Sequence, residues 1–385
     1  MEHDRMRKIL YISGTRADYG LMKYTFNKIQ NHPELQLEII ATGMHLMDEF
    51  GNTINEIKKD GFKYHIIDST YDKDDKESML NFIGTLIQKM PDVIEKIEPD
   101  IILLLGDRGE MLAGAIAGAY LSIPVAHLHG GEISSTVDDL ARHAITKLSN
   151  IHLPANLESA KRIIKMGEDP ELVFVVGAPG LDSVLCEKLI EPEKIAEIYD
   201  LDLSQPIILV LQHPVTLEVE DAPFQIRETL EAALDLKIQT ILVYPNADAG
   251  GRSMINTIQK YENNAYLKTF KSLPRRDYLS LLNIASVLVG NSSSGIIEAA
   301  SFKLPVVNIG TRQNGRDRAE NVIDATYKKE NIRAKILYCL SDEEFKNKVK
   351  YCKNPYGEGT AGTKVVDILS KIPIDQNLLQ KRANY

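Results

Sequence analysis

The segment HLHGGEISSTVDDLARHAITK, residues 127–147, contains the densest group of acid–base side chains in the chain. His127 and His129 alternate along an apolar run, two glycines follow, and Glu132 and Asp138 come next. Imidazole and carboxylate groups can both give and take protons near neutral pH. The pattern therefore predicts general acid–base catalysis, with His129, Glu132 and Asp138 as the candidate catalytic residues.

The same segment also fits a structural interpretation. Thr136 and Asp139 have the spacing of a helix capping box, and Asp138 lies one helical turn before Arg142. Arg142 is in addition a candidate substrate-binding group. Two histidines among carboxylates could also form a metal site, but the sequence has no HExxH motif. Acid–base catalysis is therefore the favoured interpretation, and no metal is expected.

A second acid–base pair follows a very apolar run in LLLGDRGE, where Asp107 and Arg108 stand together. Asp107 has two interpretations, as the N-cap of the next helix or as a catalytic carboxylate at the exit of a buried strand. We therefore treat Asp107 as a candidate catalytic residue and Arg108 as a candidate substrate-binding residue.

Two further loops in the first half have polar residues at expected strand exits. GTRADYG places Arg16 and Asp18 after the first strand, where Arg16 could pair with a phosphate. ATGMH leaves His45 at the end of the second strand. Arg16, Asp18 and His45 are predicted to bind substrate, although a solvated arginine and a structural histidine are the plainer interpretations.

The second half contains a group of residues suited to an anion. In LQHPVT, His213 precedes a proline, which favours an extended backbone and a side chain at the strand end, so His213 is both a catalytic and a binding candidate. GNSSSGIIEAASF offers hydroxyls and open backbone N–H groups at a helix start, where phosphates bind. The remaining binding candidates in this half are Asn246, Asp248, Ser292, Ser293, Ser294, Gly295, Glu298 and Arg312.

Short apolar runs alternate with amphipathic stretches of helical length throughout the chain. Runs that are apolar throughout indicate strands buried on both faces of a parallel sheet. The expected strands are residues 7–13, 35–42, 100–107, 123–129, 151–156 and 171–178, then 206–213, 238–245, 285–291 and 304–310. A charged stretch at 186–206 separates the two series. We therefore expect an α/β fold of two Rossmann-like, doubly wound parallel-sheet domains facing a cleft, at 1–185 and 206–365, with a helical tail at 366–385 whose position is open.

Composition excludes several classes of protein. The chain has 385 residues, 44% hydrophobic and 26% charged, which is a globular composition. Its net charge of −9 argues against non-specific nucleic-acid binding. We expect neither a signal peptide nor a membrane anchor at the start, where the apolar stretch is short, and the three cysteines form no framework. A cytoplasmic protein without membrane or nucleic-acid partners is expected.

At these loops the sequence resembles the hydrolysing UDP-N-acetylglucosamine 2-epimerases. The ordered set GTRADYG, TGMH, GDR, HGGE, QHPVT, PNADAG, GNSSSGIIE and GTRQNGR runs from Ile9 to about Arg316. The resemblance implies the glycosyltransferase-B architecture and a homodimer or homotetramer. Some family members carry a catalytic glutamate where this chain has His129, and others carry histidine.

The resemblance implies a reaction in two steps. A carboxylate removes the C2 proton as UDP leaves C1, and water then adds to the 2-acetamidoglucal, giving N-acetylmannosamine and UDP for nonulosonic (sialic) acid synthesis. Neither step requires a cofactor. A related branch acts on 2,4-diacetamido sugars toward legionaminic acid, and two alternatives stay open: a glycosyltransferase on the same fold and a non-catalytic nucleotide-sugar sensor.

Overall fold

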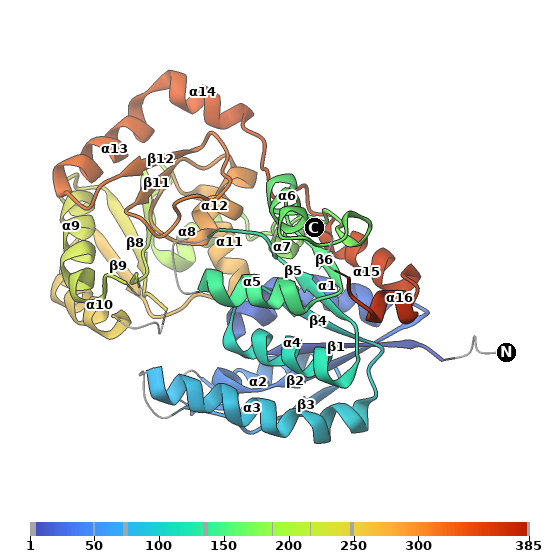
Figure 1. Ribbon diagram of the computed structural model, residues 1–385. Coiled ribbons are helices and arrows are strands. Elements are labelled where there is room, and N and C mark those ends of the chain that lie inside the picture. The colour runs from blue at the N-terminus through green and yellow to red at the C-terminus, as the bar shows by residue number, and fades with distance from the viewer. Residues whose placement is uncertain are drawn as a thin grey trace. The chain divides into compact units, whose positions relative to one another are not determined.

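The computed structural model describes residues 5–48, 51–71, 76–133, 138–186, 188–215, 217–246 and 250–382 (Figure 1). The chain forms two compact units. The first contains the described residues up to 132, those of 138–183, and those from 356 onward, and the second contains Ile133 and the described residues of 184–355. The C-terminal segment thus returns to the unit in which the chain begins.

The first unit is built on a six-stranded parallel sheet with the order β3-β2-β1-β4-β5-β6. The order reverses between β1 and β4, and ligands bind at such switch points, beyond the carboxyl ends of the strands. The strands are β1 (Arg7–Ser13), β2 (Leu35–Ala41), β3 (Tyr64–Ile66), β4 (Ile101–Leu105), β5 (Val125–Leu128) and β6 (Ile151–Leu153). The helices are α1 (Arg16–Gln30), α2 (Ile54–Asp60), α3 (Lys76–Ile97), α4 (Gly109–Leu121), α5 (Asp138–Leu148), α6 (Leu157–Lys165), α7 (Pro179–Cys186), α15 (Ala361–Lys371) and α16 (Gln376–Leu379).

The second unit repeats this plan with the order β12-β11-β10-β7-β8-β9, so its switch point lies between β7 and β10. Its strands are β7 (Ile207–Leu211), β8 (Gln239–Val243), β9 (Leu267–Phe270), β10 (Val287–Gly290), β11 (Val306–Ile309) and β12 (Val322–Ala325). Its helices are α8 (Pro192–Tyr199), α9 (Ala222–Leu234), α10 (Gly251–Ile258), α11 (Arg275–Ile284), α12 (Ser293–Ile297), α13 (Lys329–Ser341) and α14 (Glu343–Tyr351). The expected fold class, two Rossmann-like parallel-sheet domains, is confirmed.

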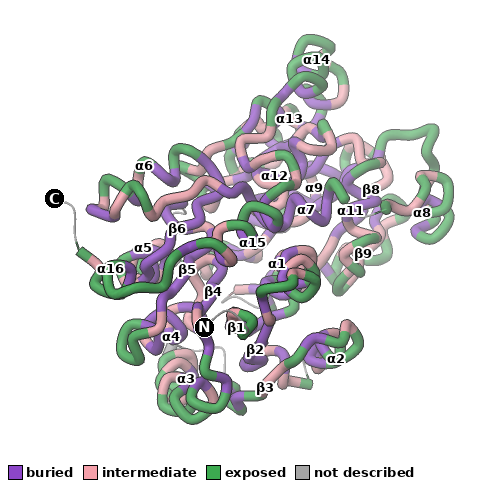
Figure 2. The backbone as a smooth tube through the Cα atoms, turned by 90° about the vertical axis from the view of Figure 1, so that its right-hand side faces the viewer, coloured by how far each residue is buried: buried purple, intermediate pink, exposed green. Residues whose placement is uncertain are grey.

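Every residue of β4 is buried, and so is every residue of β1 after Arg7 and Lys8 (Figure 2). Such burial is typical of a parallel sheet with helices on both faces. The expected strand at 171–178 is wrong. Residues Pro170–Leu172 form a 3₁₀ turn. The extended segment after it has an isolated bridge between Val173 and His152 and backbone hydrogen bonds from Phe174 to His152 and from Val176 to Pro154, which do not make up a regular strand. Three edge strands, β3, β9 and β12, were not predicted. None of the helices in the described ranges combines the length and apolar character that a bilayer crossing requires.

The tail is anchored to the first unit through both of its helices. The buried carboxylate of Asp182 accepts hydrogen bonds from the first backbone N–H groups of α15, at 2.9 Å from Ala361 and 2.5 Å from Gly362. Asn150 donates to the carbonyl of Leu378, at the end of α16, at 2.8 Å. The boundary therefore differs from the expected 206–365, because residues from 356 onward pack with the first unit.

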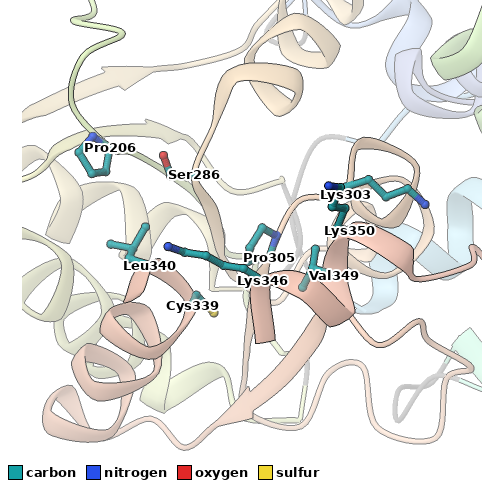
Figure 3. A pocket seen from close by; sticks show the side chains of 9 residues that line it. All are labelled: Pro206, Ser286, Lys303, Pro305, Cys339, Leu340, Lys346, Val349 and Lys350. Carbon is teal, nitrogen blue, oxygen red and sulfur yellow. The ribbon is translucent and has the colours of Figure 1, made fainter. Parts of the chain in front are cut away.

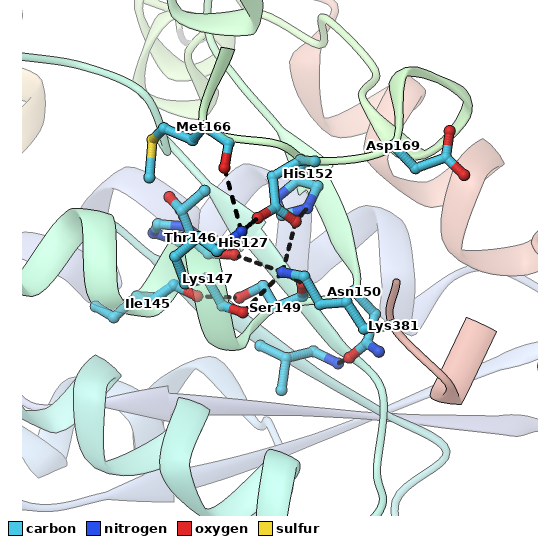
Figure 4. Close-up of polar contacts among 12 residues, drawn as sticks. His127, Ile145, Thr146, Lys147, Ser149, Asn150, His152, Met166, Asp169 and Lys381 are labelled. Carbon is cyan, nitrogen blue, oxygen red and sulfur yellow. Dashed lines mark hydrogen bonds and ion pairs between the residues drawn. The ribbon is translucent and has the colours of Figure 1, made fainter. Parts of the chain in front are cut away.

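Beside this tail, the buried carboxylate of Glu168 contacts three side chains, Lys147, His152 and Lys381, which Figure 4 labels. It is contacted by Lys147 at 2.6 Å, Lys381 at 2.5 Å and His152 at 2.9 Å. The hydrogen bonds from these partners lower the pKa of Glu168 to about 2, against the opposing effect of its own burial. Glu168 is therefore ionised in the folded protein at neutral pH.

Because the pKa of Glu168 lies below its value in an unfolded chain, this group stabilises the fold above the unfolded pKa and loses that contribution as acid protonates it. We expect Glu168→Gln to lower the unfolding temperature at pH 7, and to lower it less between pH 4.5 and 2. Thermal unfolding of both proteins across this pH range measures the difference. An equal loss of stability at every pH would contradict an ionised Glu168.

Candidate active site

The chemistry-bearing residues of the first unit lie at the carboxyl ends of three neighbouring strands, β1, β4 and β5. Asp107 follows β4, and it is not a helix cap, because Arg108 is the N-cap of α4. Arg142 of α5 donates to the Asp107 carboxylate, to Asp139 at 2.9 Å and to the carbonyl of Glu132 at 3.0 Å. Arg142 is buried and holds protein carboxylates in place, and its contact with substrate stays a prediction.

His129 and Glu132 form a pair directly after β5. The Nδ1 atom of His129 lies 2.5 Å from Oε1 of Glu132, and the side chains are only 13% and 3% exposed. His129 has a φ of +60°, in the left-handed region that most side chains avoid. Such strain persists at functional sites where the surroundings fix the backbone. A carboxylate that fixes one ring nitrogen leaves Nε2 as the atom that could exchange a proton with a substrate.

The turn after His129 depends on a glycine. Gly131 has a φ of +74°, and a Cβ atom there would lie 2.3 Å from the backbone oxygen of Ser159. Arg162 of α6 also donates to the Gly131 carbonyl at 3.1 Å. The loop that connects His129 to Glu132 is therefore tightly held from the α6 side.

His127, by contrast, is a structural residue. It is buried, its Nε2 lies 2.7 Å from the carbonyl of Gly106, and its Nδ1 lies 3.2 Å from Oγ1 of Thr146. Burial lowers its pKa to about 3, so the ring is neutral at physiological pH. His127 ties the residue before Asp107 to helix α5.

Asp18 and His45 are buried and have hydrogen-bond partners inside the protein, and their contact with substrate stays a prediction. The Asp18 carboxylate accepts hydrogen bonds from Ser13 Oγ at 2.5 Å and from the Thr15 backbone N–H at 2.7 Å. Burial raises its pKa to about 6, although these hydrogen bonds act in the other direction. His45 bonds Ser13 and Thr53, each at 2.8 Å, and burial lowers its pKa to about 4. Both groups shape the loop after β1.

The other two candidate arginines of the first unit, Arg16 and Arg108, also have partners within the protein. Arg16 pairs with Glu56 at 2.8 Å on the surface, and Arg108 contacts the buried carboxylate of Glu110 at 3.2 Å. The charge of Glu110 raises the pKa of Arg108, so the guanidinium stays charged. Glu110, which the sequence analysis missed, packs against Gly14, where a Cβ atom would lie 2.2 Å from Oε1. The Asp138 side chain lies outside the described residues.

In the second unit, His213 and Asn291 join the ends of β7 and β10. The His213 backbone N–H donates to Asn291 Oδ1 at 2.7 Å, and Asn291 Nδ2 donates to the His213 carbonyl at 2.8 Å. The Asn246 backbone N–H donates to His213 Nδ1 at 3.1 Å, so the ring proton sits on Nε2. Burial, helped by the charge of Arg312, lowers the pKa of His213 to about 3. His213 is thus a neutral hydrogen-bond donor, which fits binding better than proton transfer.

The serine loop, residues 292–294, follows β10, and its side chains have different roles. Ser292 is the N-cap of α12, and Ser294 donates to Glu298 at 2.5 Å. Glu298 is buried and also pairs with Arg275, and its contact with a ribose stays a prediction. Ser293 and the backbone up to Gly295 remain the candidate anion contacts. The Tyr278 hydroxyl lies 2.6 Å from Oγ of Ser294. Arg275, Tyr278 and Asn291 were not predicted, because their partners become visible only in the fold.

Arg312 lies with the same group of loops. Its Nη1 donates to the Asn291 carbonyl at 3.2 Å, and the adjacent Gln313 donates to the same oxygen at 2.8 Å. Asn291 therefore gathers the loops after β7, β10 and β11 around one point. Gly290 allows this close approach, because it has a φ of +138° and a Cβ there would meet the Leu211 carbonyl at 2.2 Å. Asp248 lies outside the described residues.

A cavity of about 450 Å³ in the second unit lies at the other edge of the sheet (Figure 3). Its lining includes Pro206, Ser286 and Pro305, which directly precede β7, β10 and β11. Ligands of doubly wound sheets bind beyond the carboxyl ends of the strands, so this cavity is separate from the candidate site.

Comparison with known proteins gives one consistent result. The family model described as UDP-N-acetylglucosamine 2-epimerase matches residues 27–370. The chain is 43% identical to the UDP-N,N'-diacetylbacillosamine 2-epimerase (hydrolyzing) of Legionella pneumophila, over 98% of this chain and 99% of that protein. It is 38% identical to the UDP-N-acetylglucosamine 2-epimerase of Neisseria meningitidis, over 85% and 86%. A crystal structure of a Neisseria meningitidis UDP-GlcNAc 2-epimerase bound to UDP-GlcNAc has a TM-score of 0.82 at 18% identity, over 94% of this chain and all of that one.

Proposed function

The chain belongs to the UDP-N-acetylglucosamine 2-epimerase family, and we propose that it is a hydrolysing epimerase that converts a UDP-linked 2-acetamido sugar and water into UDP and the free sugar inverted at C2. The observation that carries this proposal is the pair of acid–base groups at adjacent strand ends, Asp107 held by Arg142 and His129 held by Glu132. Inversion at C2 requires one group to remove a proton and another to return one to the opposite face.

The first step breaks two bonds of the substrate. A base takes the C2 proton, the C2–H electrons form the C1–C2 double bond, and the C1–O bond breaks with UDP as the leaving group. In the second step, water adds its oxygen to C1 and a proton returns to C2 from the other face. The sum consumes one water. Asp107 and His129 are the two groups that we assign to these proton transfers.

The second unit supplies the groups that suit the leaving diphosphate. Negative charge develops on UDP as the C1–O bond breaks, and donors fixed in advance stabilise such charge. His213 offers a neutral N–H, Arg312 a permanent cation, and Ser293 a hydroxyl near the ends of β7, β10 and β11. These three residues are our candidates for the UDP contacts.

The proposed substrate is a UDP-linked 2,4-diacetamido sugar. The Legionella pneumophila relative with this specificity in its name matches almost the whole of both chains at 43% identity, and a GDP/UDP-N,N'-diacetylbacillosamine 2-epimerase of Campylobacter jejuni matches at 36% over 83% of this chain. UDP-N-acetylglucosamine, which the sequence analysis favoured, is the second candidate, supported by the Neisseria meningitidis relative.

Proton NMR in heavy water tests both the reaction and the substrate. The purified protein is incubated separately with UDP-N,N'-diacetylbacillosamine and with UDP-N-acetylglucosamine. We expect UDP release, a free sugar with the manno configuration, and deuterium at C2, with the higher kcat/KM on the diacetamido substrate. A higher kcat/KM on UDP-N-acetylglucosamine would reverse the choice of substrate. If neither sugar nucleotide is turned over in water alone, the epimerase proposal is wrong.

Replacing Arg312 with alanine is expected to weaken UDP binding. Loss of a charge-assisted hydrogen bond costs about 1.5–3 kcal/mol, which corresponds to about a tenfold to hundredfold rise in Kd. Titration calorimetry with UDP measures this change, and Ser293→Ala should give a smaller one. Arg318→Ala is the matched control, because Arg318 pairs with Asp324 at the surface. Unchanged UDP affinity in both Arg312→Ala and Ser293→Ala would contradict the proposal that these residues bind UDP.

A further inference from the structure

Lys381, close to the C-terminus, contacts the end of helix α5. Its Nζ lies 3.1 Å from the carbonyl of Thr146, 2.8 Å from that of Lys147 and 2.6 Å from that of Ser149 (Figure 4). The last carbonyls of a helix have no partner within the helix, and a cation there also opposes the negative end of the helix dipole. Lys381 therefore caps the C-terminal end of α5, although it lies more than two hundred positions away from that helix in sequence.

The position of Lys381 is itself constrained. Its ammonium also pairs with the buried Glu168 at 2.5 Å, and Leu378 just before it is buried and accepts a hydrogen bond from Asn150. An ammonium group has three N–H donors, and here four oxygen atoms surround it. The contact is thus a fixed one, in contrast to a surface lysine that samples solvent.

Helix α5 carries the side chains that orient the candidate catalytic groups. Arg142 donates to Asp107 and to the carbonyl of Glu132. One turn further on, Thr146 contacts His127, which in turn bonds the carbonyl of Gly106, the residue before Asp107. A shift of α5 along or about its axis would therefore displace Asp107 and the Glu132 loop together.

We propose that Lys381 is a positioning residue for the epimerase reaction, which holds helix α5 in the register that Asp107 and the His129–Glu132 pair require. The inference rests on the proposed function for its kinetic readout. The tail then acts through Arg142 and Thr146 and touches no substrate. Its effect should fall on the chemical steps, whereas UDP binding by the second unit should not depend on it.

The test compares three variants of the full chain. Lys381→Met keeps the length of the side chain without its charge, Lys381→Arg keeps a cation, and Lys371→Met removes an exposed lysine of the same tail that pairs only with Asp367 among the described ion pairs. We expect Lys381→Met to lose about tenfold to hundredfold in kcat, as misplaced catalytic groups do, with unchanged KM and unchanged Kd for UDP. Lys381→Arg should recover most of the loss, and Lys371→Met should match the parent.

Two results would overturn the proposal. One is a folded Lys381→Met protein with the kcat of the parent. The other is a loss of activity that only follows the fraction of unfolded protein, with Lys381→Arg as impaired as Lys381→Met. If Lys381→Met does not fold, Lys381→Gln takes its place, because it also removes the charge but keeps a polar end that can donate hydrogen bonds. A folded Lys381→Gln protein should then have a lower kcat at unchanged KM, and a parental kcat in this variant would contradict the proposal.

Hydrogen exchange separates this inference from the proposed function. Exchange of the α5 amides should speed up in Lys381→Met, whereas exchange in the second unit should stay the same. If the parent protein turns over neither sugar nucleotide, the proposed function fails, and faster exchange in α5 would still support the capping contact. Unchanged exchange in α5 would contradict the contact whatever the activity.

Discussion

Asp107→Asn is expected to lower kcat by about 10²- to 10⁴-fold, the range over which general acid–base groups accelerate reactions. Asparagine has nearly the same shape and can still accept a hydrogen bond from Arg142, but it cannot take up or release the C2 proton. UDP affinity should not change, because the candidate UDP contacts lie in the other unit. Steady-state turnover and calorimetry with UDP measure the two quantities.

Asp139→Asn is the matched control for this experiment. Asp139 pairs with the same arginine at 2.9 Å, so its replacement disturbs Arg142 without removing the proposed proton carrier. Removing one partner of a buried ion pair can cost about 3–5 kcal/mol, so thermal unfolding of both variants must accompany the kinetics. If Asp139→Asn is as inactive as Asp107→Asn, the pairing of Arg142 is what matters, and Asp107 is not the proton carrier.

His129 and Glu132 should behave as one catalytic unit. We expect His129→Asn and Glu132→Gln each to lower kcat by about 10²-fold or more, because either change removes the imidazole or the carboxylate that orients it. Asparagine is the right replacement for His129, since it tolerates the φ of +60° better than most residues. The double variant should be no slower than the slower single variant, as is typical of groups that act together.

The kinetics of the three variants distinguish the two roles of His129. Turnover of His129→Asn within a few-fold of the parent, together with an inactive Glu132→Gln, would mean that His129 only orients the carboxylate. Effects that simply multiply in the double variant would show two independent groups. Circular dichroism and calorimetry with UDP confirm that each variant is folded.

Much of the fold follows from sequence patterns because buried parallel strands are apolar throughout. The runs at 7–13, 100–107 and 206–213 contain little else, and each corresponds to a central strand. The edge strands β3, β9 and β12 escaped prediction because they are not apolar throughout. Their sequences YHI, LKTF and VIDA each include a polar residue and partly exposed positions. The apolar run 171–178 misled because it begins in a 3₁₀ turn and continues as an extended segment that has one bridge and two backbone hydrogen bonds to the β6 region in place of a regular ladder.

The sequence predicted which loops form the candidate site, but it did not predict which side chains contact one another there. A residue such as His45 at a strand end reads the same in sequence whether it points outward or, as here, bonds Ser13 inside the protein. The pairing of Asp107 with Arg142 joins residues 35 positions apart, and the neutral state of His213 depends on burial. Both are properties of packing, which single-sequence patterns do not contain.

The return of the chain to its first unit also governs when that unit can be completed. A ribosome adds about 5–20 residues per second, so the nascent first unit must wait on the order of ten seconds while the second unit is synthesised. During that interval the strands of the first sheet have emerged without α15, α16 or Lys381. Asp182, which later caps α15, and Glu168 are then without these partners from the tail. The half of the protein made first is therefore finished last, and a chain released early would lack the contacts that complete it.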